Sequence, residues 1–352
     1  MLDKGKTNAL ILTAVCVALI GGLVYVLFFN THALITLDDP SSIVSSSAYL
    51  DMTAVVTADG NCYIRGSRVE KSHPYGVANV RQYRNQYNTL ALEQADRFVQ
   101  IYSGGDAIAV NLSKNGGTII TANNTLYLFS DTDSFLRPSY FCENIQDAKL
   151  VGDRVYVLTT DGVWGYYTIS SQKNFVAITD RITKFKIADL DKSLWLLTKD
   201  RVLLTCENVD NPQNTIRCAD NVDDFDVICV EARMQPHYLL GYIRNNEAFC
   251  YDGYGFPTET DLDALKMVNA NAISISAYLK GIIVVTPERQ ALVYGKDFGD
   301  DATFHGNTIA ENVINISTSL LSVNLALESK EMICCGSLPS SQFISIQDII
   351  RQ

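Results

Sequence analysis

The fold class that the sequence predicts is all-β, with one transmembrane helix in front of a single large β-domain. Three observations predict it: an apolar run near the N-terminus, a body rich in β-forming residues beyond that run, and one hairpin pattern that recurs seven times in the body. The apolar run bears on the compartment, and the hairpins bear on the architecture.

The apolar run covers residues 9–29 and contains no charged residue. At ~1.5 Å per residue, its 21 residues match the ~30 Å hydrocarbon core of a bilayer. A cleaved signal peptide usually has a shorter apolar core, of about 7–15 residues, before a small-residue cleavage site. Residues 31–33 make a poor cleavage site, and a buried core helix rarely has this length without a charge. We therefore expect residues 9–29 to be a transmembrane signal anchor.

Lysines flank this run on its N-terminal side only. Lys4 and Lys6 precede it, and no Lys or Arg follows until Arg65. Because Lys and Arg near a membrane span stay on the cytoplasmic side, the sequence predicts a single-pass protein with a cytoplasmic N-terminus and an extracytoplasmic C-terminal domain. The predicted segments are a cytoplasmic tail, the anchor, a short stalk and the β-domain, at residues 1–8, 9–29, 30–46 and 47–352.

The body is acidic. Removing residues 1–30, which include Lys4, Lys6 and Asp3, changes the formal net charge from −11 to −12. Negative charge of this size repels phosphate backbones, which argues against nucleic-acid binding. It also argues against a second contact with an anionic bilayer, because basic segments bind such surfaces. We therefore expect membrane contact through residues 9–29 alone.

One hairpin pattern recurs seven times along the body. Each copy consists of an apolar strand, two turn residues and a second strand. In most copies the first strand ends near Thr, and the second strand carries an aromatic residue or Cys. Asp-Gly and Asn-Asn between β-rich runs favour hairpins, because these residues tolerate the positive φ of two-residue turns. The turns begin at Asp59, Asn123, Asp161, Lys199, Asn245, Glu288 and Ser329.

The spacing of these turns is typical of propeller blades. The intervals are 64, 38, 38, 46, 43 and 41 residues, and five of the six lie near the ~40–45 residues of a four-stranded blade. Further β runs, such as 273–276 and 175–179, supply the remaining strands, and a β-sandwich would not keep one hairpin at one period. The sequence therefore predicts a seven-bladed β-propeller. A last β run at 343–346 either completes blade seven or pairs with the first blade near Ile43, protecting a sheet edge.

Three copies of the pattern share additional residues. Residues 158–165 read Leu-Thr-Thr-Asp-Gly-Val-Trp-Gly, residues 237–251 begin with His, and residues 291–295 read Ala-Leu-Val-Tyr-Gly. These copies resemble the regulator of chromosome condensation type repeat, in which an Ala-Leu-Thr strand leads through an Asp-Gly turn into a Tyr-x-Trp-Gly strand. The resemblance extends over most of residues 47–352.

The resemblance implies a seven-bladed propeller that acts as a scaffold for protein contacts. The sequence departs from the family because the Gly-Gln-Leu-Gly loop is absent and most copies lack the His and Trp. The nucleotide-exchange activity of the chromatin-bound founder is not carried over, since a translocated domain would not meet its partner. Propellers of the quinoprotein or WD-repeat type are the alternative within the same fold. Because one fold serves many functions, function has to come from a site.

No catalytic or metal-binding constellation is found in the sequence. The four histidines lack metal-ligand spacing, and there is no His-Glu-x-x-His motif, nucleophile elbow or phosphate-binding loop. We expect His237 to be a structural residue of its repeat. Acidic residues gather at 220–226, but without the alternating pattern of a calcium loop, so we expect solvated loop charge there. The sequence predicts no catalytic residue, no metal and no cofactor.

Nine cysteines are present, and eight of them follow the apolar run. If the far side of the membrane is oxidising, Cys206 and Cys218 are the pair expected to form a disulfide, because they bracket a loop containing Asn and Pro. Cys62, Cys250 and residues 334–335 fall on second strands of the hairpins, where a thiol packs as a small apolar group. Their irregular spacing favours mostly free, buried thiols.

The longest interval, before the second hairpin, contains residues 67–104. Its aromatic residues can share one face of a helix beside several arginines, and Tyr and Arg are frequent anchors of interfaces. We predict a partner-binding insertion on the propeller rim; the alternative is a longer blade whose aromatic residues pack on the core. The predicted interface residues are Arg81, Tyr83, Arg84 and Tyr87.

On these grounds the sequence predicts a membrane-anchored, non-enzymatic scaffold that presents a propeller to a protein partner on the non-cytoplasmic side. A propeller-based hydrolase or lyase acting on carbohydrate is an alternative, and it requires two carboxylates about 5–10 Å apart in the central channel. A purely structural component of an envelope is a third possibility.

Overall fold

The structure, a computed structural model, describes most of the residues between 43 and 336. The described ranges are 43–49, 52–65, 69–71, 80–82, 99–114, 116–130, 137–171, 174–210, 212, 214–231, 235–279, 281–295, 306–319, 322–328 and 332–336. The predicted anchor at 9–29 and the last β run at 343–346 lie outside these ranges. Within them, no helix has the length and apolar character needed to cross a membrane.

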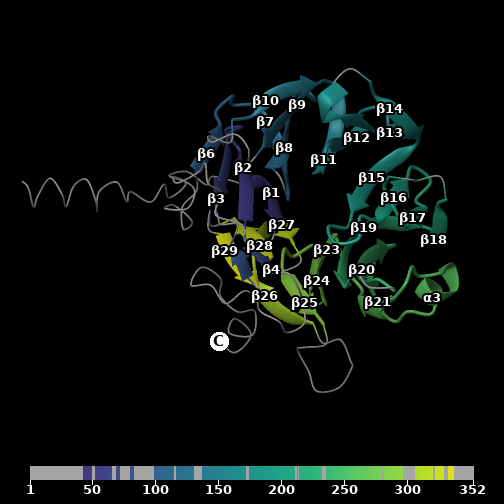
Figure 1. Cartoon of the computed structure of the whole chain (residues 1–352). Coiled ribbons are helices and arrows are strands. Elements are labelled where there is room, and N and C mark those ends of the chain that lie inside the picture. The colour runs from purple at the N-terminus through teal and green to yellow at the C-terminus, as the bar shows by residue number, and fades with distance from the viewer. Residues whose placement is uncertain are drawn as a thin grey trace, which may run out of the picture. The chain divides into compact units, whose positions relative to one another are not determined.

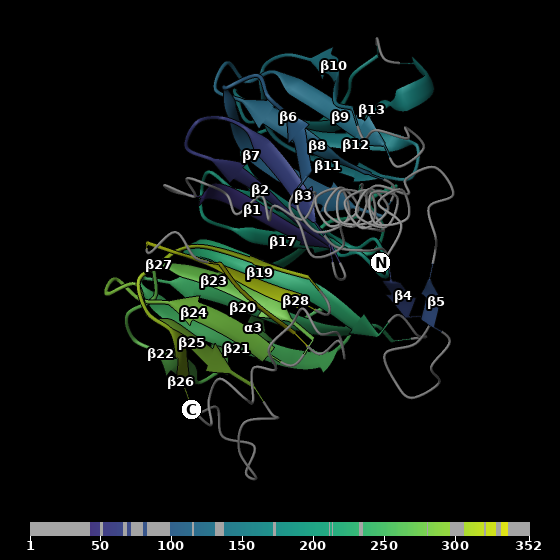
Figure 2. The same ribbon diagram turned by 90° about the vertical axis from the view of Figure 1, so that its left-hand side faces the viewer.

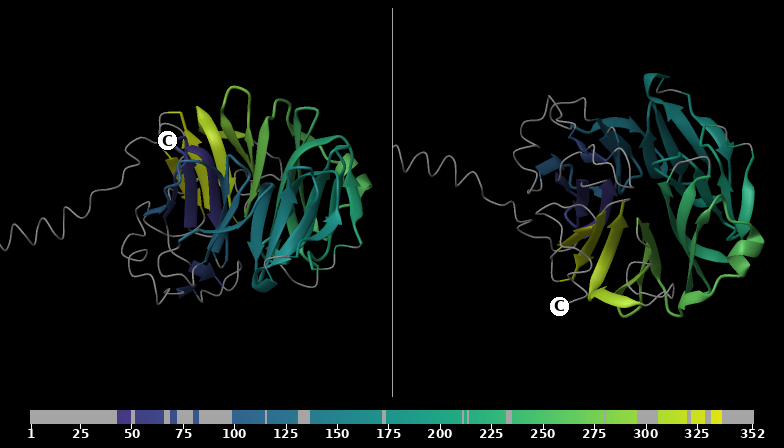
Figure 3. Two further views of the ribbon diagram at one scale, coloured as in Figure 1. Left: turned by 90° about the horizontal axis from the view of Figure 1, so that it is seen from above. Right: turned by 60° about the horizontal axis from the view of Figure 1, so that its bottom comes forward.

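Seven antiparallel sheets stand side by side around an axis as the blades of a propeller (Figures 1 and 3). Six sheets have four strands, and three strands of the seventh are described. In every blade the first strand in sequence lies nearest the axis and the later strands follow outwards. The first inner strand, β1 (Ile43–Tyr49), begins inside the predicted stalk at 30–46, so the propeller starts earlier than predicted.

From the axis outwards, the strands of blades 1 to 4 are β1, β2 (Met52–Thr57), β3 (Cys62–Arg65) and β6 (Val99–Tyr102); β7 (Ala107–Ser113), β8 (Gly116–Thr121), β9 (Leu126–Ser130) and β10 (Ser139–Cys142); β11 (Ile145–Val151), β12 (Arg154–Thr159), β13 (Trp164–Thr168) and β14 (Val176–Thr179); β15 (Ile182–Ile187), β16 (Leu194–Thr198), β17 (Leu203–Cys206) and β18 (Ile216–Ala219). Those of blades 5 to 7 are β19 (Val222–Glu231), β20 (His237–Arg244), β21 (Glu247–Tyr254) and β22 (Met267–Asn269); β23 (Ser274–Tyr278), β24 (Gly281–Val285), β25 (Ala291–Tyr294) and β26 (Asn307–Ala310); β27 (Val313–Thr318), β28 (Ser322–Leu327) and β29 (Met332–Gly336). One short helix, α3 (Glu259–Asp263), precedes β22.

The seven predicted hairpins are the second and third strands of the seven blades, and the prediction of a seven-bladed propeller is confirmed. Second strands such as β2, β8 and β24 are buried along their whole length. Each lies in the middle of its blade, between inner and outer strands, with a core on both faces of the sheet. These strands therefore appear in the sequence as continuous apolar runs and not as alternating ones.

The turns of these hairpins differ from the predicted two-residue loops. In blade 3 the N–H of Gly162 donates to the carbonyl oxygen of Thr159 (3.0 Å), and the N–H of Thr159 donates to the carbonyl oxygen of Val163 (2.9 Å), so the loop has three residues. Only the last of them, Gly162, has a positive φ (+89°), as in a type I turn closed by a bulge. Blades 1, 2, 4 and 6 share this loop, whereas blade 5 has the two-residue turn, with positive φ at Asn245 and Asn246.

At the six described junctions from blade 1 to blade 7, the last residue of the loop also joins its blade to the next one. Its carbonyl oxygen accepts a hydrogen bond from the N–H of the first residue of the following inner strand or, in blade 6, from Ala272, two residues before that strand. These donor–acceptor pairs are Ala107–Gly60, Ile145–Asn124, Ile182–Gly162, Val222–Arg201, Ala272–Asn246 and Val313–Arg289, at 2.7–3.0 Å. Arginine at positive φ is uncommon, so what repeats at this position is the backbone conformation and not the residue type.

The hydrophobic core is divided among the junctions between blades. Trp164 of blade 3 packs near Phe185 of blade 4, with ring centroids 6.2 Å apart. One junction further on, Trp195 of blade 4 meets Tyr238 of blade 5 at 5.6 Å. Each cluster contains side chains of two adjacent blades, so a blade is stabilised mainly by its neighbours, as in other repeat proteins.

Polar side chains join the last blade to the first. Thr53 of β2 and Asn324 of β28 are fully buried, and the hydroxyl of Thr53 donates to Asn324 Oδ1 (3.2 Å). Nearer the axis, the hydroxyl of Ser46 lies 2.5 Å from Asn315 Oδ1 and 2.9 Å from Ser317 Oγ. Blade 1 contains the first described strands of the chain and blade 7 the last. These side-chain hydrogen bonds therefore close the ring between the two ends of the described chain.

A small hairpin accounts for part of the long interval before the second turn. β4 (Val69–Lys71) and β5 (Val80–Gln82) follow the third strand of blade 1 in sequence and precede its fourth strand. They form a separate two-stranded sheet (Figure 2). Arg81 lies in β5, and thus in a strand and not in the predicted helix. The other predicted interface residues lie outside the described ranges, so their role stays a prediction: Tyr83, Arg84 and Tyr87.

Cys206 and Cys218 are free thiols in the structure, and the disulfide predicted for an oxidising compartment is not formed. Cys206 packs between blades 3 and 4, whereas Cys218 packs between blades 4 and 5, so the two side chains lie on opposite faces of one sheet. Burial raises the pKa of Cys218 to about 12, which keeps the thiol protonated. Cys62 and Cys250, predicted to be buried thiols, are both buried.

Candidate functional site

The inner strands of the seven blades enclose a cavity of about 270 Å³ on the propeller axis. Side chains alternate between the two sides of a strand, so residues two apart on one inner strand reach the cavity together. Such pairs are Asp147 and Lys149 of β11, Lys184 and Lys186 of β15, Asp224 and Asp226 of β19, and Ser274 and Ser276 of β23.

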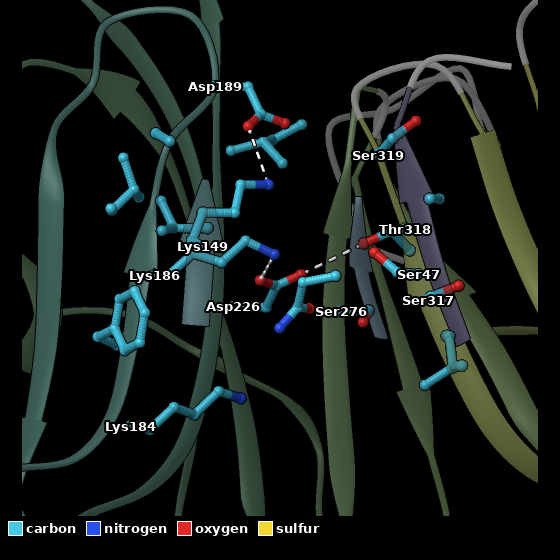
Figure 4. A pocket seen from close by; sticks show the side chains of 18 of the residues that line it. Ser47, Lys149, Lys184, Lys186, Asp189, Asp226, Ser276, Ser317, Thr318 and Ser319 are labelled. Carbon is cyan, nitrogen blue, oxygen red and sulfur yellow. Dashed lines mark hydrogen bonds and ion pairs between the residues drawn. The ribbon is translucent and has the colours of Figure 1, made fainter. Parts of the chain in front are cut away.

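Charge is distributed unevenly around this cavity (Figure 4). One side, here called the charged wall, belongs to blades 3–5 and consists of Asp147, Lys149, Lys184, Lys186, Asp189, Asp224 and Asp226. The other side, here called the hydroxyl wall, belongs to blades 6, 7 and 1 and consists of Ser46, Ser47, Ser274, Ser276, Ser317, Thr318 and Ser319. The same position of the blade thus carries charged groups in one half of the ring and neutral hydroxyls in the other.

Ion pairs of the charged wall run from blade to blade. Lys184 Nζ lies 2.6 Å from Asp224 Oδ1, which links β15 to β19. Lys149 Nζ lies 3.2 Å from Asp189 Oδ1 in the loop after β15, and it also donates to the carbonyl oxygen of Leu112 in β7 (2.9 Å). Each ammonium group is therefore held by groups from a neighbouring blade.

Asp226 is the most connected residue of the wall. Its Oδ1 lies 2.6 Å from Lys186 Nζ, while its Oδ2 accepts from the N–H of Ala277 (2.9 Å) and from the hydroxyl of Thr318 (3.3 Å). Burial alone would raise the pKa of Asp226, but the ammonium groups of Lys186 and Lys184 and the hydrogen bonds outweigh it, so the pKa lies below its ordinary value. Asp226 is therefore ionised and joins blade 5 to blades 4, 6 and 7.

Asp147 has a different environment on the same wall. Its Oδ1 accepts hydrogen bonds from Asn111 Nδ2 and from the N–H of Ala148, both at 2.8 Å. Burial is the largest influence and raises its pKa, against these hydrogen bonds and the nearby ammonium groups. The pKa values of Asp147 and Asp226 are thus shifted in opposite directions on the same wall.

The hydroxyl wall makes neutral contacts of the same kind. Ser47 Oγ accepts from the N–H of Leu112 (2.9 Å), and Ser45 Oγ accepts from the N–H of Val110 (3.4 Å), so β1 is tied to β7. On the other side of β1, Ser46 contacts Asn315 and Ser317 of β27, in blade 7. The polar lining of the cavity therefore acts as a belt that connects the inner strands around the axis.

The prediction of solvated loop charge at 220–226 is wrong for two of its residues. Asp224 and Asp226 lie within β19 and line the cavity. Their partners, Lys184 and Lys186, precede them by 40 residues each, which is one blade repeat. The matching Lys-x-Lys and Asp-x-Asp patterns in successive inner strands are the sequence signal that identifies these pairs.

The remaining candidates do not form a second site. His237 opens β20, and its Nε2 lies 2.5 Å from Asp252 Oδ1 while its ring stacks on Tyr254 with centroids 4.6 Å apart. All three residues belong to blade 5, in keeping with a structural role. In the described part of the chain, no group of three His, Cys, Asp or Glu side chains is arranged to hold a metal ion.

No family model matches the sequence, and no curated protein matches it. Solved structures do match the fold. Human WBSCR16 superposes with a TM-score of 0.54 at 9% identity, over 79% of this chain and 85% of that chain. Prp20p from Saccharomyces cerevisiae, the yeast RCC1, superposes with a TM-score of 0.53 at 11% identity, over 78% and 80%. The fold is similar to that of RCC1-type propellers.

PorZ of Porphyromonas gingivalis superposes with a TM-score of 0.50 at 10% identity, over 84% of this chain and 37% of that chain. This chain therefore corresponds to little more than a third of PorZ. At these identities the likenesses show the fold alone. They agree with the resemblance to the regulator of chromosome condensation type repeat at the level of a seven-bladed propeller.

Proposed function

We propose that this protein is a non-enzymatic scaffold for protein partners, anchored in a membrane by residues 9–29 and presenting its propeller on the non-cytoplasmic side. The observation that carries the scaffold proposal is the use of the channel charges. The lysines of the charged wall each face an aspartate of the next blade. The charged side chains of the channel therefore stabilise the ring of blades. The two broad faces of the propeller are left for contacts with protein partners.

The fold of the relatives supports this proposal by analogy. The yeast propeller Prp20p has been studied for its binding to Gsp1p and histones, and PorZ is described as a bacterial surface component of a secretion system. A scaffold is a common use of this fold, because its blades vary on the surface while the backbone stays constant.

The anchor proposal rests on residues 9–29 and on the lysines that precede them. Residues 30–42 are all that separates the predicted anchor from β1. Thirteen residues reach at most ~45 Å when fully extended. The scaffold would therefore meet partners close to the bilayer.

Topology is the first test. Full-length protein tagged at both ends should resist extraction from membranes at alkaline pH, and protease should digest the propeller only from the non-cytoplasmic side. Leu19→Arg with Ile20→Arg, in the middle of the apolar run, should abolish integration because arginine is costly at the bilayer centre. Digestion of the propeller from the cytoplasmic side would refute the orientation, and extraction of the unaltered protein would refute the anchor.

A carbohydrate-active enzyme is the second candidate, and one observation favours it. Asp224 and Asp226 point into the cavity from one side of β19, ~7 Å apart by strand geometry, which lies in the range of paired glycosidase carboxylates. Hydrolysis of a glycan panel that is lost in Asp224→Asn and in Asp226→Asn would establish this function and refute the scaffold proposal. If the unaltered protein hydrolyses no glycan, the enzyme candidate is refuted.

A further inference from the structure

Each inner strand of the propeller carries one extra residue near its start. The pairing with the second strand skips one residue in six blades: Val44, Ile108, Gln146, Thr183, Asp223 and Ile314. In blade 6, Ile273 takes the same place. The N–H of Ala272 donates to the carbonyl oxygen of Asn246 in the preceding turn, and regular pairing with the second strand starts at Ser274, opposite Val285. These seven bulge residues lie where the inner strands begin, on the face of the disc that carries the loops between second and third strands. We call this face the turn face.

The bulge residues divide the ring into two sectors. Blades 3–5 carry Gln146, Thr183 and Asp223. The four consecutive blades 6, 7, 1 and 2 carry only branched aliphatic residues, here called the apolar arc: Ile273, Ile314, Val44 and Ile108. Single exposed aliphatic residues are ordinary, but a row of them at one structural position in adjacent blades is a surface.

The apolar arc is open to solvent in the described structure. Ile273 is 55% exposed, Val44 46% and Ile108 45%, and Ile314 is half-buried. The strands that carry them contact one another in order, β23 with β27, β27 with β1, and β1 with β7. A bulge residue stands outside the ladder and points away from the core, so its side chain is available to a partner.

Acidic residues surround the apolar arc. Asp59, Glu288 and Glu311 are exposed on the turn face of blades 1, 6 and 7. Among the described turn-face loops of these four blades, Arg289 is the only cationic residue, and it is already paired with Glu328. In blades 4 and 5, by contrast, three carboxylates of this face have arginine partners, in the pairs Arg181–Asp200, Arg201–Asp223 and Arg217–Asp220.

We infer that the apolar arc binds a protein segment in which aliphatic side chains stand beside Lys or Arg. This inference rests on the proposed scaffold function and names its contact surface and the chemistry of its partner. Aliphatic side chains of the partner would cover the arc, and burying this apolar surface would contribute to the binding free energy. The partner's Lys or Arg side chains would pair with the carboxylates of Asp59, Glu288 and Glu311. An anionic lipid surface would be repelled by the same carboxylates. A second copy of this chain, with net charge −11 and the same acidic rim, would be repelled as well.

The test uses the full chain in phosphatidylcholine nanodiscs and a displayed library of random 12-residue peptides. Selected peptides should be enriched in aliphatic residues next to Lys or Arg. In the arc variant, Ile108→Thr with Ile273→Thr, the Kd of a synthetic selected peptide should rise about tenfold or more. Thr183 occupies the same position in blade 4, so these substitutions suit the backbone and should not change the melting temperature.

The matched control is Val176→Thr with Ile216→Thr, which alters aliphatic residues of similar exposure, 42% and 41%, on the outer strands β14 and β18. Its Kd should change less than twofold. A further variant, Glu288→Gln with Glu311→Gln, should raise the Kd a few-fold and weaken its dependence on salt.

Peptides that bind the arc variant as well as the unaltered chain would overturn the inference and leave the scaffold function standing. Selected peptides without cationic residues would overturn the partner chemistry. A dimer that the arc variant dissociates would mean that a second copy covers the arc, which also overturns the inference. No selected peptide at all would count against the scaffold function itself.

Discussion

Blades 3–5 and blades 6, 7, 1 and 2 share one backbone plan but differ at equivalent positions. In the channel, the first group contributes Lys–Asp pairs and the second contributes mainly hydroxyls. On the turn face, the first group has polar bulge residues and three carboxylates paired with arginine, whereas the second has the apolar arc and a single such pair, Arg289–Glu328, among the described residues. Both tryptophans, Trp164 and Trp195, also belong to the first group.

The difference shows which contacts the fold requires. The hydrogen bond from a positive-φ loop residue to the next blade occurs in both groups, at Gly60 and at Gly162 for example. Strand pairing and this bond involve the backbone, so they do not constrain the side chains of the inner strands. The two halves could therefore diverge, one toward internal ion pairs and the other toward an exposed surface.

The charged wall should contribute more to stability than the hydroxyl wall. We expect Asp226→Ala to lower the free energy of unfolding by about 3 kcal/mol at pH 7, because it leaves Lys186 without its counter-charge in a largely buried site. Ser46→Ala, in the hydroxyl wall, should cost about 1 kcal/mol. Urea unfolding followed by tryptophan fluorescence measures both. Equal losses would contradict the distinction between the walls.

The backbone link should matter equally in both groups. Gly162→Ala should cost about 1–2 kcal/mol, because alanine resists positive φ. Gly162→Asn should cost clearly less, since Asn124 adopts the same conformation in blade 2. Gly60→Ala should cost at least as much as Gly162→Ala, because a Cβ there would collide with the backbone of Gly105. Thermal melts of the three variants test this, and a harmless Gly60→Ala would show that the link is dispensable in the second group.

Asp226 and Asp147 should respond to pH in opposite ways. The folded-state pKa of Asp226 is lowered, so its stabilisation is present above the unfolded pKa of about 3.9 and disappears as the pH falls through the folded value. The folded-state pKa of Asp147 is raised, so its stabilisation is complete below the unfolded pKa and is lost as the pH rises through the folded value.

Asparagine variants separate the two cases. Asp226→Asn should destabilise at pH 7 and approach the unaltered protein in acid. Asp147→Asn should stabilise by less than about 1 kcal/mol at pH 7, because the amide oxygen keeps both hydrogen bonds without a buried charge. Urea unfolding at pH 7, 5 and 4 provides the comparison. Destabilisation by Asp147→Asn at pH 7 would mean that the carboxylate form is the one the channel requires.

Sequence patterns predicted the strands better than the turns and the channel. The runs around 155–165 and 282–294 became hairpins as predicted, because β-forming residues and turn residues act over a few positions. The three-residue loops were missed because Lys199–Arg201, which ends on an arginine at positive φ, has no turn signature. The acidic residues at 220–226 indicate a loop in the sequence, although Asp224 and Asp226 lie in β19, because their partners Lys184 and Lys186 lie on another strand.

Local chemistry along the chain was enough to establish the all-β class, the repeat and the number of blades, because hairpin formation depends on neighbouring residues and recurs at a constant interval. The ion pairs across 40 residues, the closure through Thr53 and Asn324, and the apolar arc depend on the ring. Inner strands become neighbours only when the blades pack around one axis. Contacts between residues so far apart in sequence leave no local signal, and they are set by packing in three dimensions.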